Sequence, residues 1–362
     1  MGIRNRYRTM IALTVQLLFT ACAKSTAATD SPQQSKGLKD YFSDYFTMGV
    51  AVSPAALSGP ESDLILKNFG SLTCENVMKP APIHPDENRY SWTNADLIAN
   101  YAKANKLKMR GHTLVWHRQS PAWFFKDEQG NPATKELVLK RLREHIHQVV
   151  GRYKGVVYAW DVVNEAIDDS DQKTYRETDW YKICGPEYIA SAFRYAHEAD
   201  PDALLFYNDY NTENPVKREK IINMIKGLLD EGVPIHGIGL QGHWSVSYPS
   251  EKQLRESIDQ YAKLGLKIQV TELDVSVYPS GHNNPDDDAF TPEREQKQID
   301  QYKMIFRVLR NYRSVISAVT FWNVSDKSSW LDNYPVPGRK NYPLLFDTNL
   351  QPKKAFWEIV NW

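Results

Sequence analysis

The sequence contains little cysteine and no excess of charge of either sign. Its three cysteines in 362 residues are too few for the set of disulfide bonds that holds a small secreted domain together. The 44 lysines and arginines balance 44 aspartates and glutamates, which gives no electrostatic indication of nucleic-acid binding. The chain also lacks a phosphate-binding glycine-rich loop, a Gly-x-Ser-x-Gly nucleophile motif and a Cys-x-x-Cys pair. These absences exclude a disulfide-stapled scaffold and leave nothing that indicates a nucleotide or nucleic-acid partner.

Long apolar runs are missing too, apart from one near the N-terminus. Three arginines within the first eight residues precede residues 10–21, an apolar stretch too short to span a membrane but typical of a signal-peptide core. Cys22 follows a small residue, where bacterial lipoprotein signals carry their acylated cysteine. We therefore predict a lipoprotein-type signal peptide over residues 1–21 and a flexible polar tether over residues 22–37. The protein would then be exported and lipid-anchored at the outer membrane or surface of a Gram-negative bacterium; simple secretion is the alternative.

The rest of the composition is that of a large folded domain. Hydrophobic residues make up 42% of the chain, which excludes a disordered protein. Ten tryptophans and 20 tyrosines accompany only 13 phenylalanines. Tryptophan and tyrosine suit stacking on sugar rings, although packing in the core explains them equally well at this point.

After residue 37 the sequence alternates between short apolar runs and amphipathic segments. Helical spacing of three or four separates the apolar residues from Leu139 to Tyr153, and Ser250 to Gln253 form a capping box that starts another helix. Eight strand–helix units in one chain predict a closed (β/α)8 TIM barrel of the α/β class, a single domain over residues 38–362. The expected strands are 46–52, 71–76, 108–116, 156–165, 203–211, 237–244, 267–275 and 316–324.

Two of these strands end in glutamates that follow apolar stretches. Glu165 ends the fourth strand and Glu272 lies near the end of the seventh. A barrel carries its chemistry at the C-terminal ends of its strands, and a buried carboxylate without a partner is costly. One such glutamate could be half of a structural salt bridge, but two at one barrel mouth favour a catalytic carboxylate pair.

At this point the chain resembles glycoside hydrolase family 10, the endo-β-1,4-xylanases. The resemblance covers residues 38–362 and follows the strand ends in order. The motifs that carry it are Thr73-Cys-Glu-Asn-Val-Met-Lys79, Gly111-His-Thr-Leu-Val-Trp-His117, Asp161-Val-Val-Asn-Glu-Ala166, Tyr207-Asn-Asp-Tyr-Asn211, Gly239-Leu-Gln-Gly-His243, Thr271-Glu-Leu-Asp274 and Phe321-Trp-Asn323. Cys74 departs from the pattern, because the family usually has alanine there.

The resemblance implies a retaining, two-glutamate hydrolysis of β-1,4-xylosidic bonds in xylan. Glu165 would be the general acid/base and Glu272 the nucleophile. His243 would bridge Glu272 and Asp274 and so keep the nucleophile ionised. Asn164 would bond the 2-hydroxyl of the sugar under attack.

The resemblance also implies a substrate-binding set and no cofactor. Gln119 and Trp330 would crowd the position of a C6 hydroxymethyl group and so favour xylose over glucose. The full set, with Gln241 supporting catalysis, is Glu75, Asn76, Lys79, His112, Trp116, Gln119, Asn208, Trp322 and Trp330. The expected partners are xylan and xylo-oligosaccharides, with the protein a monomer. A β-1,4-glucanase of the same clan and a non-catalytic glycan-binding barrel remain as alternatives.

Several other residues have simpler interpretations. His112 and His117 have no third ligand at metal spacing, so we predict no metal site. His145 and His147 are expected to be solvated on a helix, and Trp160 and Trp180 to be packed in the core. Cys74 and Cys184 are expected to be free thiols.

Overall fold

The computed structural model describes residues 36–361. The predicted signal peptide, Cys22 and the tether up to residue 35 lie outside the described residues. Residues from Lys36 onward form one compact unit. In residues 36–361, no helix has both the length and the apolar character needed to cross a membrane.

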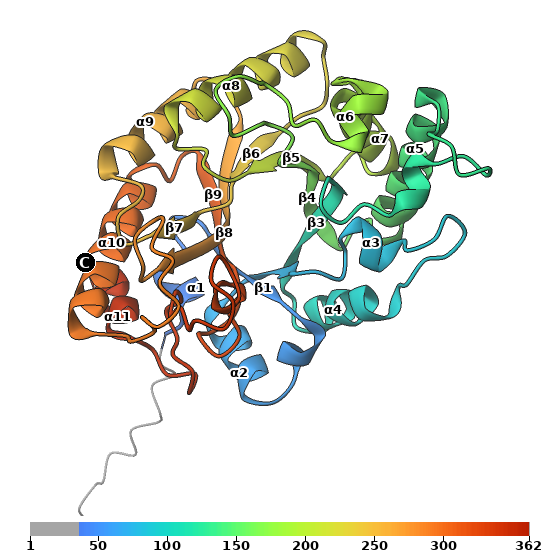
Figure 1. Ribbon diagram of the computed structural model, residues 1–362. Helices are drawn as coiled ribbons and strands as arrows, with labels where there is room; N and C mark the ends of the chain where they lie inside the picture. The colour runs from blue at the N-terminus through green and yellow to red at the C-terminus, as the bar shows by residue number, and fades with distance from the viewer. Residues whose placement is uncertain (1–35, 362) are drawn as a thin grey trace, which may run out of the picture. The chain divides into compact units, whose positions relative to one another are not determined.

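The structure confirms the predicted TIM barrel (Figure 1). Eight parallel strands close into a ring, because β6 pairs with both β5 and β8, and β1 pairs with both β2 and β9. The strands are β1 (Thr47–Val52), β2 (Ser71–Cys74), β3 (Lys108–Trp116), β4 (Val157–Asn164), β5 (Leu204–Asp209), β6 (Gly237–Leu240), β8 (Lys267–Ser276) and β9 (Ile316–Phe321). A short additional strand, β7 (His243–Ser245), pairs with the end of β8.

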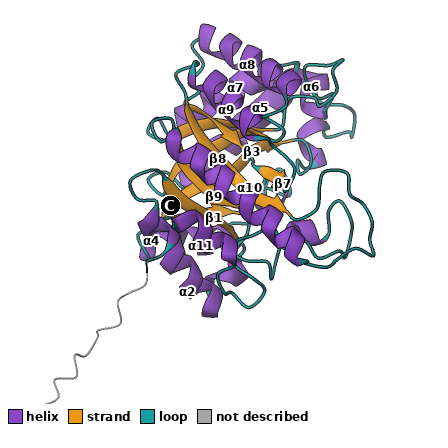
Figure 2. Ribbon diagram, turned by 90° about the vertical axis from the view of Figure 1, so that its left-hand side faces the viewer, coloured by secondary structure: helices purple, strands orange, loops and turns teal. Residues whose placement is uncertain are grey.

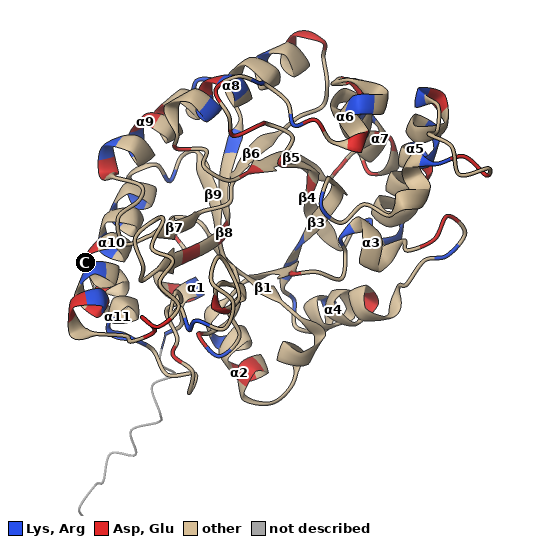
Figure 3. Ribbon diagram, in the orientation of Figure 1, with Lys and Arg blue, Asp and Glu red and all other residues tan. Residues whose placement is uncertain are grey.

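The helices lie outside the strands (Figure 2). Acidic and basic side chains are interspersed along the outer helices (Figure 3), as a solvated barrel surface requires. The α-helices are α1 (Leu38–Tyr41), α2 (Gly59–Asn68), α3 (Pro80–Ile83), α4 (Thr93–Ala104), α5 (Lys135–Arg152), α6 (Asp179–Cys184), α7 (Glu187–Ala199), α8 (Pro215–Asp230), α9 (Glu251–Ala262), α10 (Pro292–Asn311) and α11 (Lys354–Val360). Short 3-10 helices occupy Pro54–Leu57, Ala122–Phe125 and Trp330–Asp332.

The predicted strand at 237–244 is in fact two strands. It breaks between Leu240 and His243, where Gly242 has a φ of +78°. A side chain there would be strained, and its Cβ would lie 2.8 Å from a methyl group of Val270. The break lets Gln241 and His243 both lie at the mouth of the barrel, as described below.

The structure agrees with the predicted helices but not with the predicted exposure of one residue on them. Ser250 caps α9 by accepting a hydrogen bond from the backbone of Gln253, which confirms the capping box. His145, expected in solvent, is instead buried, and its Nδ1 lies 3.0 Å from Nδ1 of His84. The position is three residues after Leu142 and four before Val149, so it belongs to the inward face of α5.

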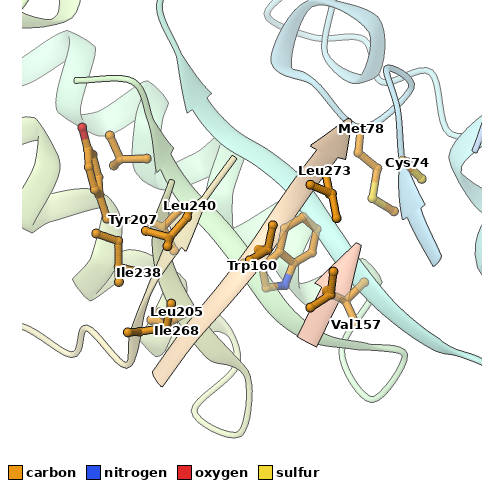
Figure 4. Packing of buried hydrophobic residues seen from close by; sticks show 14 of the residues in the cluster. Cys74, Met78, Val157, Trp160, Leu205, Tyr207, Ile238, Leu240, Ile268 and Leu273 are labelled. Carbon is orange, nitrogen blue, oxygen red and sulfur yellow. The ribbon is translucent and has the colours of Figure 1, made fainter. Parts of the chain in front are cut away.

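The core contains the tryptophans that we expected to be structural. Trp160 and Trp180 are both buried, and Figure 4 shows Trp160 among aliphatic side chains of the barrel. Its ring lies against Gly111 of the next strand, where a Cβ would come within 2.1 Å of it. Cys74 and Cys184 are buried free thiols, as predicted.

One buried group in the barrel was not predicted. Arg110 on β3 donates from both terminal nitrogens to Asp161 on β4, and its Nε donates to Gln269 on β8 at 2.9 Å. Both members of the ion pair are almost fully buried. Oδ2 of Asp161 also lies 2.9 Å from Nδ1 of His112. The ion pair is thereby connected to a residue that was predicted to bind substrate.

Candidate active site

The predicted site residues converge on one cavity of about 540 Å³ at the C-terminal ends of the strands. The cavity combines five acidic or basic side chains with amides, imidazoles and indoles. The predicted residues that line it are Glu75, Asn76, Lys79, His112, Trp116, Asn164, Glu165, Gln241, His243, Glu272, Trp322 and Trp330. Arg118, Tyr210, Asn211 and Tyr334 also line it and were not predicted.

Glu272 is held as a carboxylate. Its Oε1 accepts a hydrogen bond from Asn208 at 2.8 Å, and its Oε2 lies 3.1 Å from Nε2 of His243. Burial alone would raise the pKa of Glu272. Electrostatic interactions with His112 and Lys79 and the contact with His243 outweigh burial and lower that pKa to about 2. Glu272 is therefore ionised at neutral and mildly acidic pH.

His243 lies between two carboxylates. Its other nitrogen, Nδ1, is 2.9 Å from Asp274, and Nε1 of Trp330 donates to the same Asp274 oxygen at 2.8 Å. Burial lowers the pKa of His243, but Asp274 and Glu272 together raise it to about 10. His243 is therefore an imidazolium that donates to both carboxylates, as the family resemblance implied.

Glu165 immediately follows β4 in an unusual backbone conformation. Its φ is +58°, in the left-handed region that is sparsely populated by residues other than glycine. The carboxylate oxygens accept hydrogen bonds from Nε1 of Trp116 at 2.8 Å and from Gln241 at 3.0 Å. Its backbone nitrogen donates to the carbonyl of Asn208 at 2.9 Å. The side chain is thus held in the cavity by Trp116 on β3 and by Gln241, which directly follows β6, while its backbone is bonded to Asn208 on β5.

The chain segment after Glu165 is held by a buried tyrosine on β5. The hydroxyl of Tyr207 accepts hydrogen bonds from the backbone nitrogens of Ala166 and Ile167, at 3.1 and 3.2 Å. It donates in turn to Asp209 at 2.5 Å. These contacts hold in place the chain segment that directly follows Glu165.

Asp209 is paired in the same buried network. Its other oxygen lies 2.8 Å from Nζ of Lys217 on α8. Burial raises the pKa of Asp209 to about 6, against the opposing effect of Lys217. The hydrogen-bond network that holds the segment after Glu165 therefore extends from Tyr207 and Asp209 on β5 to Lys217 on α8, outside the barrel.

A chain of amides connects the two glutamates. Gln241 donates to both Glu165 and Asn164, at 3.0 and 3.3 Å. Asn208 donates to both Asn164 and Glu272, at 2.9 and 2.8 Å. Each amide is thereby fixed in orientation by the carboxylates that it serves.

Two predicted residues lie elsewhere than expected. Asn208 is fully buried and orients Asn164 and Glu272 from below, so it is not among the residues that line the cavity. Gln119 does not line the cavity either; its backbone carbonyl accepts from Ala81 at 2.8 Å. Of the two residues expected to crowd a C6 hydroxymethyl group, only Trp330 lines the cavity in this structure.

The cavity is lined by aromatic rings together with a cation. Nζ of Lys79 lies 4.9 Å from the ring centre of Trp116 and 5.9 Å from that of Trp322. The same Nζ donates to Asn76 at 2.8 Å. Burial lowers the pKa of Lys79, while Glu272 and Glu75 oppose that shift. Rings beside hydrogen-bonding groups form a surface suited to a sugar, which has both apolar faces and hydroxyls.

The residues that sequence reasoning missed left weak signals. Tyr210 and Asn211 directly follow β5, where a barrel places functional residues, and they belong to the motif Tyr207-Asn-Asp-Tyr-Asn211, but neither was assigned a role in the site. Tyr334 belongs to the long loop of residues 331–342 after β9. Its position beside the cavity depends on how that loop folds, which the sequence does not indicate. Within residues 36–361, no three histidine, cysteine or acidic side chains are grouped so as to hold a metal ion.

Comparison with known proteins gives consistent matches. Residues 37–362 match glycosyl hydrolase family 10. The chain is 50% identical to endo-1,4-beta-xylanase B of Paenibacillus barcinonensis over 88% of this chain and 96% of that one. It is 48% identical to a beta-1,4-xylanase of Dictyoglomus thermophilum, over 99% of both chains.

The solved structures agree. A xylanase from Paenibacillus barcinonensis in complex with a conduramine derivative superposes with a TM-score of 0.89 at 48% identity, covering 91% of this chain and 99% of that one. An endo-1,4-beta-xylanase from Caldicellulosiruptor owensensis gives a TM-score of 0.89 at 46% identity, covering 91% and 100%.

Proposed function

The chain belongs to glycosyl hydrolase family 10 and is a glycoside hydrolase, and from this premise we propose that it cleaves β-1,4-xylosidic bonds within xylan with retention of configuration. The observation that supports the mechanism best is the different environment of the two glutamates in one cavity. Glu272 is ionised against an imidazolium, whereas Glu165 contacts neutral donors, Trp116 and Gln241. This asymmetry fits one nucleophile and one acid/base.

In the first step Glu272 attacks the anomeric carbon while Glu165 protonates the departing oxygen. The product is a covalent glycosyl-enzyme and a shortened chain. In the second step Glu165, now a carboxylate, takes a proton from water, and this water releases the sugar from Glu272. Asn164, fixed by Asn208 and Gln241, is placed to bond the 2-hydroxyl as charge develops.

Preference for xylose would rest on a rigid Trp330. Its Nε1 donates to Asp274, and its ring lies 4.8 Å from the ring of His243 and 5.2 Å from that of Tyr334. A ring held on three sides cannot move aside for a hydroxymethyl group. Discrimination of about 1–3 kcal/mol is typical of one such group.

Proton NMR of a fresh digest tests the mechanism. If hydrolysis proceeds by double displacement, the β-anomer of the new reducing end appears first and the α-anomer forms only later by mutarotation. If the α-anomer appears first, the reaction inverts and Glu272 is not a nucleophile. Parallel digests of xylan and carboxymethylcellulose test the substrate class, because a glucanase would release more product from the second.

The variants of the two glutamates separate their roles. Glu272→Ala should abolish turnover on every substrate, since no group remains to attack the anomeric carbon. Glu165→Ala should retain the first step on dinitrophenyl xylosides, whose leaving group needs no proton, and added azide should restore turnover. Equal loss in both variants on dinitrophenyl substrates would contradict this assignment.

The proposal includes the site of action. The signal-like N-terminal segment and Cys22 support export and lipid anchoring, with xylan reached outside the cell by a monomeric barrel.

A further inference from the structure

Residues 165–178 begin at the catalytic cavity with Glu165 and then fold back on themselves. The backbone of Ile167 forms an antiparallel bridge with that of Tyr175. This fold brings the side chain of Arg176 to the backbone of Glu165, although the two residues are 11 positions apart in the sequence.

The backbone of Glu165 is bonded on both sides of its Cα atom. Its carbonyl accepts a hydrogen bond from Nε of Arg176 at 3.1 Å, and the nitrogen of the same peptide group, that of Ala166, donates to Tyr207. On the other side, the Glu165 nitrogen donates to the carbonyl of Asn208 at 2.9 Å. A left-handed conformation persists only where the surroundings restrain it. Arg176 supplies the restraint on the carbonyl side.

The other end of the Arg176 guanidinium is fixed in its turn. Its Nη2 donates to Asp169 at 2.6 Å and to the hydroxyl of Tyr210, and this hydroxyl donates to the same Asp169 oxygen. The second oxygen of Asp169 accepts from Nζ of Lys217 on α8 at 2.8 Å. Burial raises the pKa of Asp169, but its three donors outweigh burial and lower that pKa to about 2. Asp169 is therefore a carboxylate at neutral and mildly acidic pH and keeps the guanidinium in one orientation.

The same guanidinium reaches a second residue of the catalytic cavity. Tyr210, whose hydroxyl accepts from Arg176, lines that cavity, and its ring centre lies 3.7 Å from Nζ of Lys217. Arg176 thereby joins the chain that follows β4, with Glu165, to the chain that follows β5, with Tyr210.

We propose that Arg176 is a positioning residue for the acid/base. By bonding the carbonyl of Glu165, it holds the left-handed backbone that directs the carboxyl group of Glu165 toward the departing oxygen. Arg176 is not among the described residues that line the cavity, so it acts through Glu165 and not on the substrate. This inference rests on the proposed function, because it needs Glu165 to be the proton donor.

The test measures how kcat/KM depends on the leaving group. The substrates are dinitrophenyl xylobioside, whose leaving group needs no proton, and phenyl xylobioside, whose leaving group does. Arg176→Met removes the donor to the carbonyl but leaves Asp169 its contacts with Lys217 and Tyr210. Since general acid catalysis contributes about 10²–10⁴ in rate, kcat/KM should fall about tenfold or more on the phenyl substrate and change little on the dinitrophenyl one. An equal fall on both substrates, or no fall on the phenyl one, would overturn the proposal.

Lys220→Gln is the matched control within the same segment. Nζ of Lys220 on α8 donates to three backbone carbonyls within residues 168–173, all of which come after Glu165. Its loss should loosen the segment without releasing the Glu165 carbonyl, so the ratio of kcat/KM on the two substrates should remain that of the wild type. An equal change of this ratio in the control would assign the effect to the order of the loop and not to Arg176.

Asp169→Ala tests the same contacts from their other end. The variant is expected to fold, because Asp169 is partly exposed and Lys217 keeps Asp209 as a partner at 2.8 Å. Without Asp169 the guanidinium of Arg176 is held less firmly, so the ratio should shift in the same direction as in Arg176→Met, but by less. An unchanged ratio would overturn the proposal even if Arg176→Met failed to fold.

The outcomes separate this inference from the function on which it rests. If the wild type hydrolyses both xylobiosides and Arg176→Met keeps the wild-type ratio, only the positioning role fails. If the wild type hydrolyses neither, the proposed function fails and the positioning role fails with it.

Discussion

Tyr207 has no exposed surface, yet its hydroxyl contacts three groups that fix the segment after Glu165. Two are backbone N–H donors, and the third is the carboxylate of Asp209. A residue in a left-handed conformation returns to more favourable angles unless its surroundings prevent it. We infer that Tyr207 positions the acid/base without meeting the substrate.

Tyr207→Phe should therefore impair proton donation more than nucleophilic attack. General acid catalysis typically contributes about 10²–10⁴ in rate, so a misplaced Glu165 should lower kcat/KM on xylo-oligosaccharides about tenfold or more. The rate on dinitrophenyl xylobioside, whose leaving group needs no acid, should change little. Tyr261→Phe is the control, because that hydroxyl is also buried but donates to the carbonyl of Thr212. Equal losses on both substrates would mean that Tyr207 is only structural.

The charge on His243 makes a prediction about pH. In the intact enzyme the pKa of Glu272 is about 2, so protonation of the nucleophile should not limit activity in mild acid. His243→Asn removes a positive charge and a donor, and the pKa of Glu272 should rise toward its ordinary value. The acidic limb of kcat/KM on dinitrophenyl xylobioside should then move to higher pH.

A control variant separates this effect from a general one. His147→Asn alters a partly exposed histidine of α5, which pairs with Glu198 and does not line the cavity, and should leave the acidic limb in place. An acidic limb at the same pH in His243→Asn as in the wild type would show that His243 does not set the pKa of Glu272.

Between neighbouring strands, the buried pair of Arg110 and Asp161 joins β3 to β4. Removing one member of a buried ion pair leaves an uncompensated charge and typically costs about 3–5 kcal/mol. Arg110→Met should lower the free energy of unfolding in guanidinium chloride by about that amount. Arg89→Met breaks the exposed pair with Asp86 and should cost less than about 1 kcal/mol. Similar losses in the two variants would contradict the importance of burial.

The elements themselves were largely predictable from sequence. The expected strands begin within one residue of the observed ones, because turn residues interrupt the apolar runs. Most of them also end within two residues, but the last expected strand, 316–324, ends three residues early, at Phe321. The break between β6 and β7 was missed, because the sequence does not show whether a glycine in a strand-like run adopts a negative or a positive φ. His145 was misplaced because its polarity was given more weight than its position on the inward face of α5.

The site was predictable where a residue lies at the C-terminal rim of the barrel and lines the cavity. Glu165, Glu272, Gln241 and His243 satisfy that condition. Residues that act through another residue, such as Tyr207 and Arg110, cannot be recognised from the sequence, because their role depends on which strands become neighbours.

At the scale of the whole molecule, the remaining prediction concerns where the barrel is held. If Cys22 is acylated after signal removal, the protein carries two or three acyl chains, each buried methylene contributing about 0.8 kcal/mol to membrane binding. The polar stretch from Cys22 to the barrel, about 15 residues, can span at most about 50 Å, which sets how far from the membrane the cavity can reach a polymer.

Cys22→Ala should move the protein from the membrane fraction to the soluble fraction, because the single acylated side chain is gone. Expression in a bacterial host, followed by fractionation and activity on xylan in each fraction, measures the shift. Cys184→Ala removes a buried thiol of the barrel instead and should remain with the membrane. Since the barrel is unaltered in Cys22→Ala, its specific activity on soluble xylo-oligosaccharides should equal that of the wild type, whereas activity of whole cells on insoluble xylan should fall. A Cys22→Ala protein that stays with the membrane as fully as the wild type would refute lipid anchoring through this residue.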